Sequence, residues 1–343
     1  MTAADRLGDL DADVLIVGAG PSGLYAAYYA GLRELSVVLL DSLPEPGGQL
    51  MALYPQKPIY DVAGLPEVTG AELTRALTVQ AEMARPTWVL GEQAMTLLRN
   101  PPGPGRRFTV TTHRGRRLCV DGVVIAAGIG SFQPRRLDAA EAHLGCGVTY
   151  SLGDLTAYRD RDVVIVGGGD SAVDWSLMVE PIARSLTVVH RRRSLRAHPR
   201  SVSRLQQTPA RILLDSEVVA THGDSRLEAV AVRHRDGTES RFPADALIAA
   251  LGHTATLGPL ATWEFELSGR QIVVDERMAT TLPGAFAIGD VTAHRGKVRI
   301  MAVGFGEAAT AINNLATELR PGEPVFPGHS TDLMATASIP EPL

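Results

Sequence analysis

The sequence predicts an α/β protein made of two Rossmann-like domains, each a three-layer ββα arrangement around a dinucleotide-binding turn. Two observations predict this fold. A glycine-rich turn follows a short apolar segment at 14–23 and again at 163–172, and each turn leads into a helix-compatible stretch and a second apolar segment. A glycine turn between strand and helix is typical of pyrophosphate binding. Because the same order of elements occurs twice in 343 residues, we expect two related domains.

Composition excludes several classes of protein. A net charge of −5 with 21% charged residues indicates a globular protein without bulk attraction to nucleic acid or anionic membranes. The first residues are acidic, unlike a secretory signal, and Gly and Pro interrupt the longest apolar stretch, which argues against a membrane span. The two cysteines, Cys119 and Cys146, imply no disulfide framework, and the histidines show no ligand spacing. We expect a cytoplasmic protein without a metal site.

The first domain begins with a strand at 14–17, a helix at 24–32 and a strand at 37–40. The turn after the first strand contains Gly18, Gly20, Pro21, Ser22 and Gly23. Its glycines allow a tight turn, close approach of backbone to a pyrophosphate and packing of helix on strand, while the helix N-terminus offers free N–H groups. Asp41 ends the second strand, where a carboxylate accepts from adenosine ribose hydroxyls.

The remaining elements are predicted from apolar periodicity and turn residues. In the first copy they are a Pro/Gly-rich loop after Asp41, a helix at 69–84, a strand at 89–98 and a hairpin at 108–126. In the second copy they are strands at 163–166, 185–189 and 227–234, a turn at 236–237 and a strand that ends at 246–252.

A last strand, at 285–288, ends in Gly289–Asp290, and a helix runs from about Gly304 to a stop at 321–322. Strand end and helix start can share one edge of the sheet. There Asp290 can bond a chain of sugar-like hydroxyls, and the helix N-terminus can favour negative charge on a reduced flavin ring. The alternative is an ordinary turn, because Gly-Asp is a common turn sequence.

The second glycine turn contains Gly167, Gly169, Asp170, Ser171 and Ala172. Where the first copy has Asp41, the second has His190, followed by Arg191, Arg192 and, further on, Arg196. Guanidinium groups suit the 2′-phosphate of NADP(H), which a carboxylate would repel. A solvated or nucleic-acid-binding basic run is the alternative, but the position directly after the second strand of a nucleotide unit favours NADP(H).

The motifs GAGPSG, GGGDSA, HRRRSLRAH and FAIGD, in this order, resemble the flavoprotein pyridine nucleotide-disulfide oxidoreductase superfamily, with a length and layout similar to thioredoxin reductases. The Cys-x-x-Cys of thioredoxin reductases is absent, because the matching segment around 151–154 has no cysteine. A flavin without a dithiol must pass its electrons elsewhere. The segments 47–64, 296–308 and 329–331 are similar to those of thioredoxin-reductase-like ferredoxin–NADP reductases.

This resemblance implies a set of FAD-binding residues beyond the glycine turn. They are Asp41, Gly48, Gln49, Tyr54, Met95, Phe132, Gly289, Asp290 and Thr331. Tyr54 and His329 resemble the two rings that flank the isoalloxazine in that family. Met95 stands where we expect a Val, which puts a side-chain contact in doubt but leaves a backbone contact possible. Without the resemblance, Tyr54 reads as loop packing and His329 as an exposed side chain.

The resemblance also implies an activity: FAD takes hydride from NADPH at N5 and releases electrons singly to ferredoxin or flavodoxin, with no acid/base triad. It places FAD on 1–134 and 254–343, NADP(H) on 135–253, and a flavin-covering C-terminal tail in a homodimer. The joining segments near 133–136 and 253–256 are candidate hinges. Because ferredoxins are acidic, docking needs a local basic patch, for which the arginines near 191–204 are candidates. The alternatives are an NADPH diaphorase for quinones, dyes or a small disulfide, and a non-catalytic flavin-binding sensor.

Overall fold

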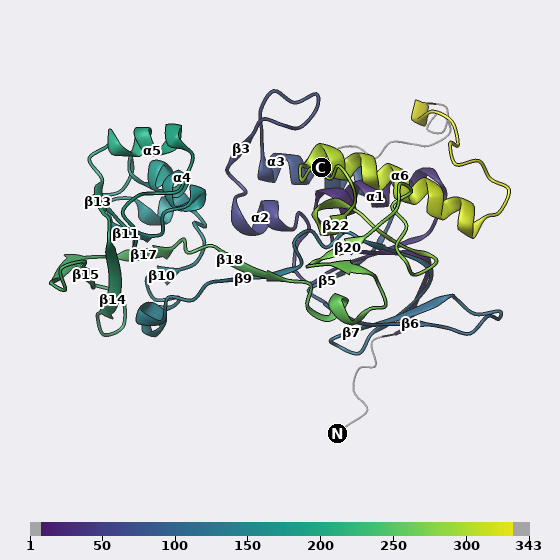
Figure 1. Cartoon of the computed structure of the whole chain (residues 1–343), viewed down its shortest axis with the longest axis horizontal. Helices are drawn as coiled ribbons and strands as arrows, with labels where there is room; N and C mark the ends of the chain where they lie inside the picture. The colour runs from purple at the N-terminus through teal and green to yellow at the C-terminus, as the bar shows by residue number, and fades with distance from the viewer. Residues whose placement is uncertain (1–7, 332–343) are drawn as a thin grey trace, which may run out of the picture. The chain divides into compact units, whose positions relative to one another are not determined.

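The computed structural model describes residues 8–331, with only the backbone of residues 132 and 133. The chain forms two compact units: unit 1 comprises Met1–Ser131 and Ala255–Leu343, and unit 2 comprises Phe132–Thr254. Unit 2 is thus an insertion in unit 1. The two connecting segments, β9 (Ser131–Pro134) and β18 (His253–Thr256), pair as a two-stranded sheet. The two units and their elements are shown in Figure 1.

Unit 1 is built on a seven-stranded sheet in the order β5-β2-β1-β8-β7-β6, with β21 also paired to β8. Its strands are β1 (Leu10–Val17), β2 (Val37–Asp41), β5 (Thr87–Leu90), β6 (Ala94–Arg99), β7 (Phe108–Thr112), β8 (Arg117–Ile125) and β21 (Ala285–Ala287). The pairs β1–β2, β1–β8, β2–β5 and β8–β21 are parallel, whereas β6, β7 and β8 form an antiparallel meander. The core of β1, Val14–Val17, is buried on both faces, as a covered parallel strand requires.

Three helices pack on one side of this sheet: α1 (Pro21–Leu32), α3 (Gly70–Glu82) and α6 (Met301–Leu319). In Figure 1 they lie above the sheet, whose β6–β7 hairpin is at the lower edge of the view. Smaller elements are α2 (Gln49–Leu53), β3 (Pro58–Ile59), β4 (Val68–Thr69), η3 (Gly258–Thr262), β19 (Leu267–Ser268), β20 (Gln271–Val273), η4 (Gly289–Val291) and β22 (Thr292–Ala293). Fully buried Leu15, Leu24 and Phe286 join sheet and helices in one core.

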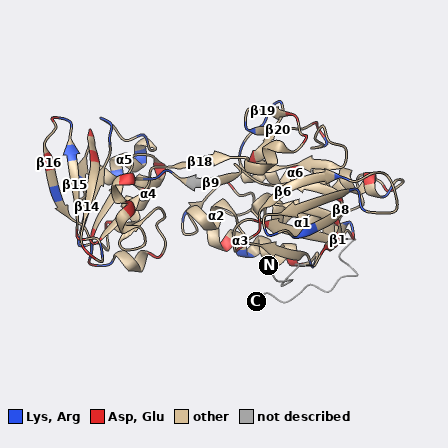
Figure 2. Cartoon of the chain, turned by 90° about the horizontal axis from the view of Figure 1, so that it is seen from below, with Lys and Arg blue, Asp and Glu red and all other residues tan. Residues whose placement is uncertain are grey.

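Unit 2 repeats the plan with a five-stranded parallel sheet in the order β10-β17-β11-β12-β13. Its strands are β10 (Val148–Thr149), β11 (Asp162–Val166), β12 (Ser185–Val189), β13 (Arg211–Leu213) and β17 (Ala246–Ala249). An antiparallel meander contains β14 (Ser216–His222), β15 (Ala229–His234) and β16 (Glu239–Pro243). The helices are η1 (Asp138–His143), η2 (Leu155–Tyr158), α4 (Asp170–Val179) and α5 (Pro199–Gln206). Figure 2 shows basic residues along β15 and β16.

The structure confirms the predicted α/β fold class and its internal duplication, but corrects three elements. The strand predicted at 89–98 is wrong, because Gly91 adopts φ +69° and separates β5 from β6. The loop after Asp41 contains the short helix α2, and the arginine-rich segment continues into α5. Polar composition hid α5, which buries only Leu205. Among the described residues, no helix combines the length and hydrophobicity needed to cross a bilayer.

Candidate cofactor sites

Three long helices begin without a side-chain cap, and each begins at a predicted site. The N-cap residues of α1, α4 and α6 are Gly20, Gly169 and Ile300, and none accepts a capping bond. By contrast, Thr69 and Glu72 close the start of α3 with a capping box. The first N–H groups of a helix need partners, and anions supply them. The starts of α1, α4 and α6 therefore keep donors for a ligand.

In the first glycine turn, neighbouring backbone atoms leave no room for a side chain at two of the glycines but leave open space at the third. A Cβ on Gly18 would lie 2.4 Å from the Ala126 oxygen, and one on Gly23 only 1.8 Å from the Gly18 oxygen. A Cβ on Gly20 would meet nothing within 4 Å. The backbone at Gly20 thus borders open space at the start of α1. That space fits a dinucleotide pyrophosphate, because phosphate oxygens can approach the free amides there.

The Asp41 carboxylate is bound to its own backbone surroundings. Its Oδ2 accepts from the Ala19 N–H at 2.6 Å and its Oδ1 from the Leu43 N–H at 2.8 Å. Burial raises the pKa of Asp41, and these backbone bonds oppose that shift. Asp41 therefore fixes the glycine turn, a role that the sequence reasoning did not assign. Its contact with ribose stays a prediction, which a second lone pair on each oxygen permits.

The glycine turn, the Gly289–Asp290 turn and the start of α6 meet closely around Ser22. A Cβ on Gly304 would lie 2.3 Å from Ser22 Oγ, and one on Gly289 would lie 3.0 Å from it. The loop before α2 comes equally near, because a Cβ on Gly48 would lie 3.1 Å from the Gly20 Cα. The structure therefore brings these predicted FAD residues to one edge of the unit 1 sheet.

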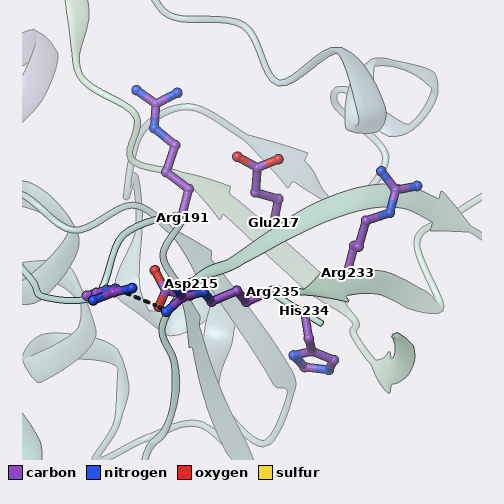
Figure 3. A pocket seen from close by; sticks show the side chains of 7 residues that line it. Arg191, Asp215, Glu217, Arg233, His234 and Arg235 are labelled. Carbon is purple, nitrogen blue, oxygen red and sulfur yellow. Dashed lines mark ion pairs between the residues drawn. The ribbon is translucent and has the colours of Figure 1, made fainter. Parts of the chain in front are cut away.

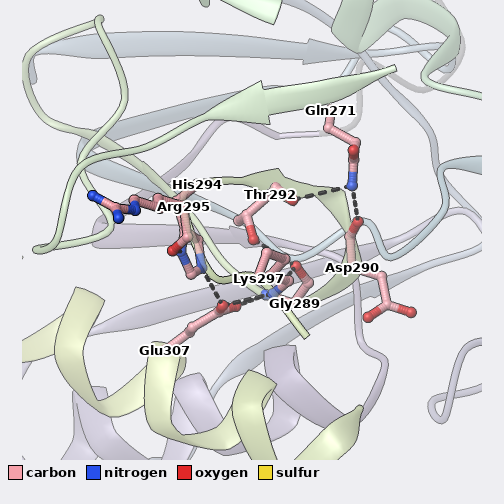
Figure 4. A network of polar contacts seen from close by, with 8 residues as sticks. All are labelled: Gln271, Gly289, Asp290, Thr292, His294, Arg295, Lys297 and Glu307. Carbon is pink, nitrogen blue, oxygen red and sulfur yellow. Dashed lines mark hydrogen bonds and ion pairs between the residues drawn. The ribbon is translucent and has the colours of Figure 1, made fainter. Parts of the chain in front are cut away.

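A buried polar network holds the Gly289–Asp290 turn in place (Figure 4). Glu307 of α6 accepts from the Gly289 N–H at 2.7 Å, from Lys297 Nζ at 2.6 Å and from His294 Nε2 at 3.0 Å. Lys297 also donates to the Gly289 oxygen at 2.9 Å. The Lys297 and Glu307 side chains are only 8% and 6% exposed. Sequence reasoning missed this pair, although a glutamate inside the apolar segment 301–312 was a signal.

The Asp290 carboxylate points away from this network, as Figure 4 shows. Gln271 Nε2 donates to the Asp290 backbone oxygen at 3.3 Å, while the carboxylate itself bonds no other described residue. Tyr54 follows α2 and is half-buried. Burial raises the pKa of Tyr54, and the charge of nearby Asp290 adds to that rise, whereas Lys57 opposes it. The Asp290 carboxylate, without a partner among the described residues, thus acts electrostatically on Tyr54, as expected for two side chains at one FAD site.

Gln49 joins the same edge, because a Cβ on Gly128 would lie 2.9 Å from Gln49 Nε2. Met95 is at an irregularity in β6 and is 37% exposed. Its backbone oxygen accepts from Trp263 Nε1 at 3.2 Å and keeps a second lone pair, so the expected backbone contact with adenine stays a prediction. Phe132 belongs to β9, and its side chain lies outside the described residues.

His329 and Thr331 are exposed in the C-terminal segment. The His329 ring lies 5.3 Å from the Phe326 ring. Among the described residues, neither His329 nor Thr331 has a hydrogen bond or ring contact with the other candidate FAD residues. One chain by itself therefore does not bring Tyr54 and His329 together, and their shared role stays a prediction.

The second glycine turn has the same geometry as the first. A Cβ on Gly167 would lie 2.3 Å from the Ala250 oxygen, whereas one on Gly169 would meet nothing within 4 Å. Ala172, which replaces the third glycine of the turn, is fully buried, and its methyl group packs beside Gly167. Ser171 is exposed at the start of α4, and Asp170 Oδ1 accepts from the His198 N–H at 2.8 Å. Asp170 thus anchors the segment that leads into α5.

His190 packs on this turn. A Cβ on Gly168 would lie 2.4 Å from the His190 ring, so the ring fills the space that a side chain would need. His190 is buried, and its Nε2 has no hydrogen-bond partner in the part of the chain that the structure describes. Burial lowers the pKa of His190, and the charges of Arg196, Arg192 and Arg191 lower it further, against a backbone bond at Ser194. The ring is therefore neutral near pH 7, and its Nε2 is left for a ligand or water.

Arg191, Arg192 and Arg196 are exposed and have no side-chain partner among the described residues. Arg193, in contrast, lies 3.8 Å from the Asp215 carboxylate. An open hollow of about 410 Å³ lies here, lined by Arg191, Arg193, Asp215, Glu217, Arg233, His234 and Arg235. In Figure 3 Arg191 extends away from Asp215. Unpaired guanidinium groups directly after β12 fit a 2′-phosphate.

Cys119 belongs to β8 in unit 1 and Cys146 to the segment before β10 in unit 2, and both thiols are free. Between residues 8 and 331, no group of three or more His, Cys, Asp and Glu is arranged to hold a metal ion.

Comparison with known proteins identifies the family. Residues 12–313 match the pyridine nucleotide-disulphide oxidoreductase family, so the chain belongs to that family. A ferredoxin–NADP reductase of Frankia casuarinae is 51% identical over 93% of this chain and 98% of its own. One from Thermus thermophilus is 43% identical over 94% and 97%. Thioredoxin reductase of T. acidophilum has a similar fold, with a TM-score of 0.73, 24% identity and coverage of 90% of this chain and 99% of its own.

Proposed function

We propose that this chain is an FAD-dependent ferredoxin–NADP(+) reductase, with FAD on unit 1 and NADP(H) on unit 2. The observation that carries the proposal is the pair of open glycine turns. One lies beside the Asp290 carboxylate and the other beside Arg191, Arg192 and Arg196, and none of these four groups has a side-chain partner among the described residues. Relatives named ferredoxin–NADP reductase, 43–51% identical over at least 93% of the chain, support the same activity.

Bound FAD supplies the redox chemistry, accepting hydride from NADPH at N5 and giving up electrons one at a time. The chain binds and orients the cofactors. The amides at the start of α1 hold the pyrophosphate, Asp290 binds the ribityl hydroxyls, and the uncapped start of α6 favours negative charge at the flavin. The half-buried ring of Tyr54 would contact the isoalloxazine.

On unit 2, the start of α4 holds the second pyrophosphate, and Arg191, Arg192 and Arg196 bind the 2′-phosphate. The connecting segments β9 and β18 act as hinges for the approach of the nicotinamide. The active protein is a cytoplasmic homodimer, in which His329 and Thr331 cover the flavin of the other copy. The exposure of both residues supports this part of the proposal.

The absence of a dithiol directs electrons to a one-electron partner. Residues 151–154 contain no cysteine, and the only two thiols belong to different units. An anaerobic titration with NADPH tests the proposal. We expect the yellow protein to bleach and then to recover its colour when oxidised ferredoxin is added. A protein that bleaches but stays reduced in ferredoxin, and recovers with a quinone, is instead a diaphorase. A protein that never bleaches is a flavin-binding sensor.

A further inference from the structure

The loop between β22 and α6 displays an unusual combination of exposed side chains. Arg295, Val298, Arg299 and Ile300 are all exposed, Val298 by 53% and Ile300 by 39%. We call these four residues the docking surface. Guanidinium groups interleaved with exposed aliphatic side chains are typical of a protein interface, where apolar contacts and charges act together.

The loop that carries the docking surface is held from within. Between the exposed residues, Lys297 turns inward to Glu307 and to the Gly289 oxygen, at 2.6 and 2.9 Å. His294 makes a second bond to Glu307 at 3.0 Å. The exposed side chains are thus presented on an anchored backbone, which lowers the entropy lost when a partner binds.

The charge of the docking surface selects the partner. Neither guanidinium, on Arg295 or on Arg299, has a side-chain partner among the described residues. The chain as a whole carries −5, so an acidic protein is repelled except where positive charge is concentrated. The docking surface is such a place.

The position of the docking surface in the chain also favours an electron-transfer partner. The loop begins just after Asp290 and ends at the start of α6, the two elements assigned to the flavin. A protein that takes single electrons has to dock close to the flavin. The arginines at 191–196 belong to unit 2 and are assigned to the 2′-phosphate, whereas the docking surface belongs to unit 1 and lies between elements assigned to the FAD site.

We propose that the docking surface binds the acidic face of ferredoxin during electron transfer. The inference rests on the proposed reductase function and names the part of unit 1 that recognises the partner.

The test uses the FAD-loaded variant Arg295→Glu/Arg299→Glu in steady-state assays with NADPH and ferredoxin. We expect kcat/KM for ferredoxin to fall roughly 10-fold or more at low ionic strength, because both charges are reversed, and the deficit to shrink as salt screens them. The rate at which NADPH bleaches the flavin should stay unchanged. The control Arg117→Glu/Arg277→Glu makes the same charge change in unit 1, at arginines already paired with Asp9 and Asp275, and should leave both rates near wild type.

Equal ferredoxin kinetics in the docking variant and its control would overturn the inference. So would a loss of NADPH bleaching in the docking variant, because the loop would then serve the flavin site itself. A changed oligomeric state with unchanged ferredoxin kinetics would show that the loop is an interface between copies of this chain. If wild-type protein bleaches with NADPH but never reduces ferredoxin, the proposed function fails and the docking surface fails with it.

Discussion

The buried Lys297–Glu307 pair makes a quantitative prediction about the flavin site. Glu307→Gln keeps the side-chain shape but removes the charge that Lys297 Nζ, the Gly289 N–H and His294 Nε2 share. A glutamine amide presents only one acceptor oxygen, so Gly289 N–H and Lys297 compete for it. Because the Gly289–Asp290 turn depends on this carboxylate, we expect the variant to lose both stability and affinity for FAD.

The expected loss of stability in Glu307→Gln follows from the burial of the Lys297–Glu307 pair. Removing one partner of a buried pair costs about 3–5 kcal/mol, because the other charge is left uncompensated. Lys297 keeps its bond to the Gly289 oxygen, which favours the lower end of that range. A loss of about 3 kcal/mol lowers the melting temperature by roughly 6–12 °C in a domain of this size.

The assay is a double-variant cycle of Glu307→Gln, Lys297→Met and their combination. Melting temperatures and FAD titrations of the apoprotein are measured for each. We expect the combined variant to lose less than the two single losses added together, because it leaves no lone buried charge. Glu318→Gln is the matched control on the same helix, since its carboxylate lies 3.7 Å from Arg107 at the surface and contributes little. Wild-type melting and FAD affinity in Glu307→Gln would refute the reasoning.

Three further predictions concern the two nucleotide turns. Gly20→Ala should abolish FAD binding with little loss of apoprotein stability, because its Cβ enters empty space. Gly169→Ala should in the same way abolish binding of NADPH alone. Variants that lose melting temperature but still bind their cofactor would contradict this. Arg191→Ala combined with Arg192→Ala should raise the Kd for NADPH by roughly 10- to 100-fold, with NADH unaffected as the internal control. Because burial holds the folded-state pKa of His190 below its unfolded value, its stabilising effect is complete above about pH 6.5 and is lost as pH falls through the folded-state value. His190→Phe should therefore flatten the decline of melting temperature in acid, and a decline as steep as in wild type would argue against a neutral buried ring.

The fold could be predicted because its signals are local. Gly18, Gly23 and Gly167 stand where a Cβ would strike backbone atoms within 2.4 Å, so no other residue fits the strand–turn–helix path. The strands β1 and β11, which precede these turns, are buried on both faces over their last four residues. Their sequences are therefore continuous apolar runs that are easily predicted as strands. Where the signal was weak, prediction failed: one glycine with a positive φ divided β5 from β6, and a polar surface concealed α5.

The candidate sites were only partly predictable, because side-chain networks join residues that no sequence period relates. Glu307 meets Gly289 and Lys297 only after α6 folds back over the end of β21, and nothing in the spacing of these residues indicates the contact. Their roles toward FAD stay predictions. What the sequence did indicate, the two glycine turns, follows from steric exclusion of a Cβ at Gly18, Gly23 and Gly167.

The two glycine turns show that the residue at the end of the second strand can have a structural role in addition to the expected contact with ribose. The residue at the end of the second strand is usually interpreted as the group that reads the ribose. Here both such residues first support the turn: Asp41 accepts from the Ala19 N–H, and the His190 ring packs over Gly168. Neither side chain projects freely into solvent, since both are less than 10% exposed. In unit 2, we therefore expect discrimination between NADPH and NADH to come from the exposed arginines that follow His190, so that cofactor preference could change without disturbing the turn. Exchanging only His190 for Asp should then lower the melting temperature of the protein and leave the preference for NADPH over NADH largely unchanged. An unchanged melting temperature with a switch to NADH would instead show that this residue alone selects the cofactor.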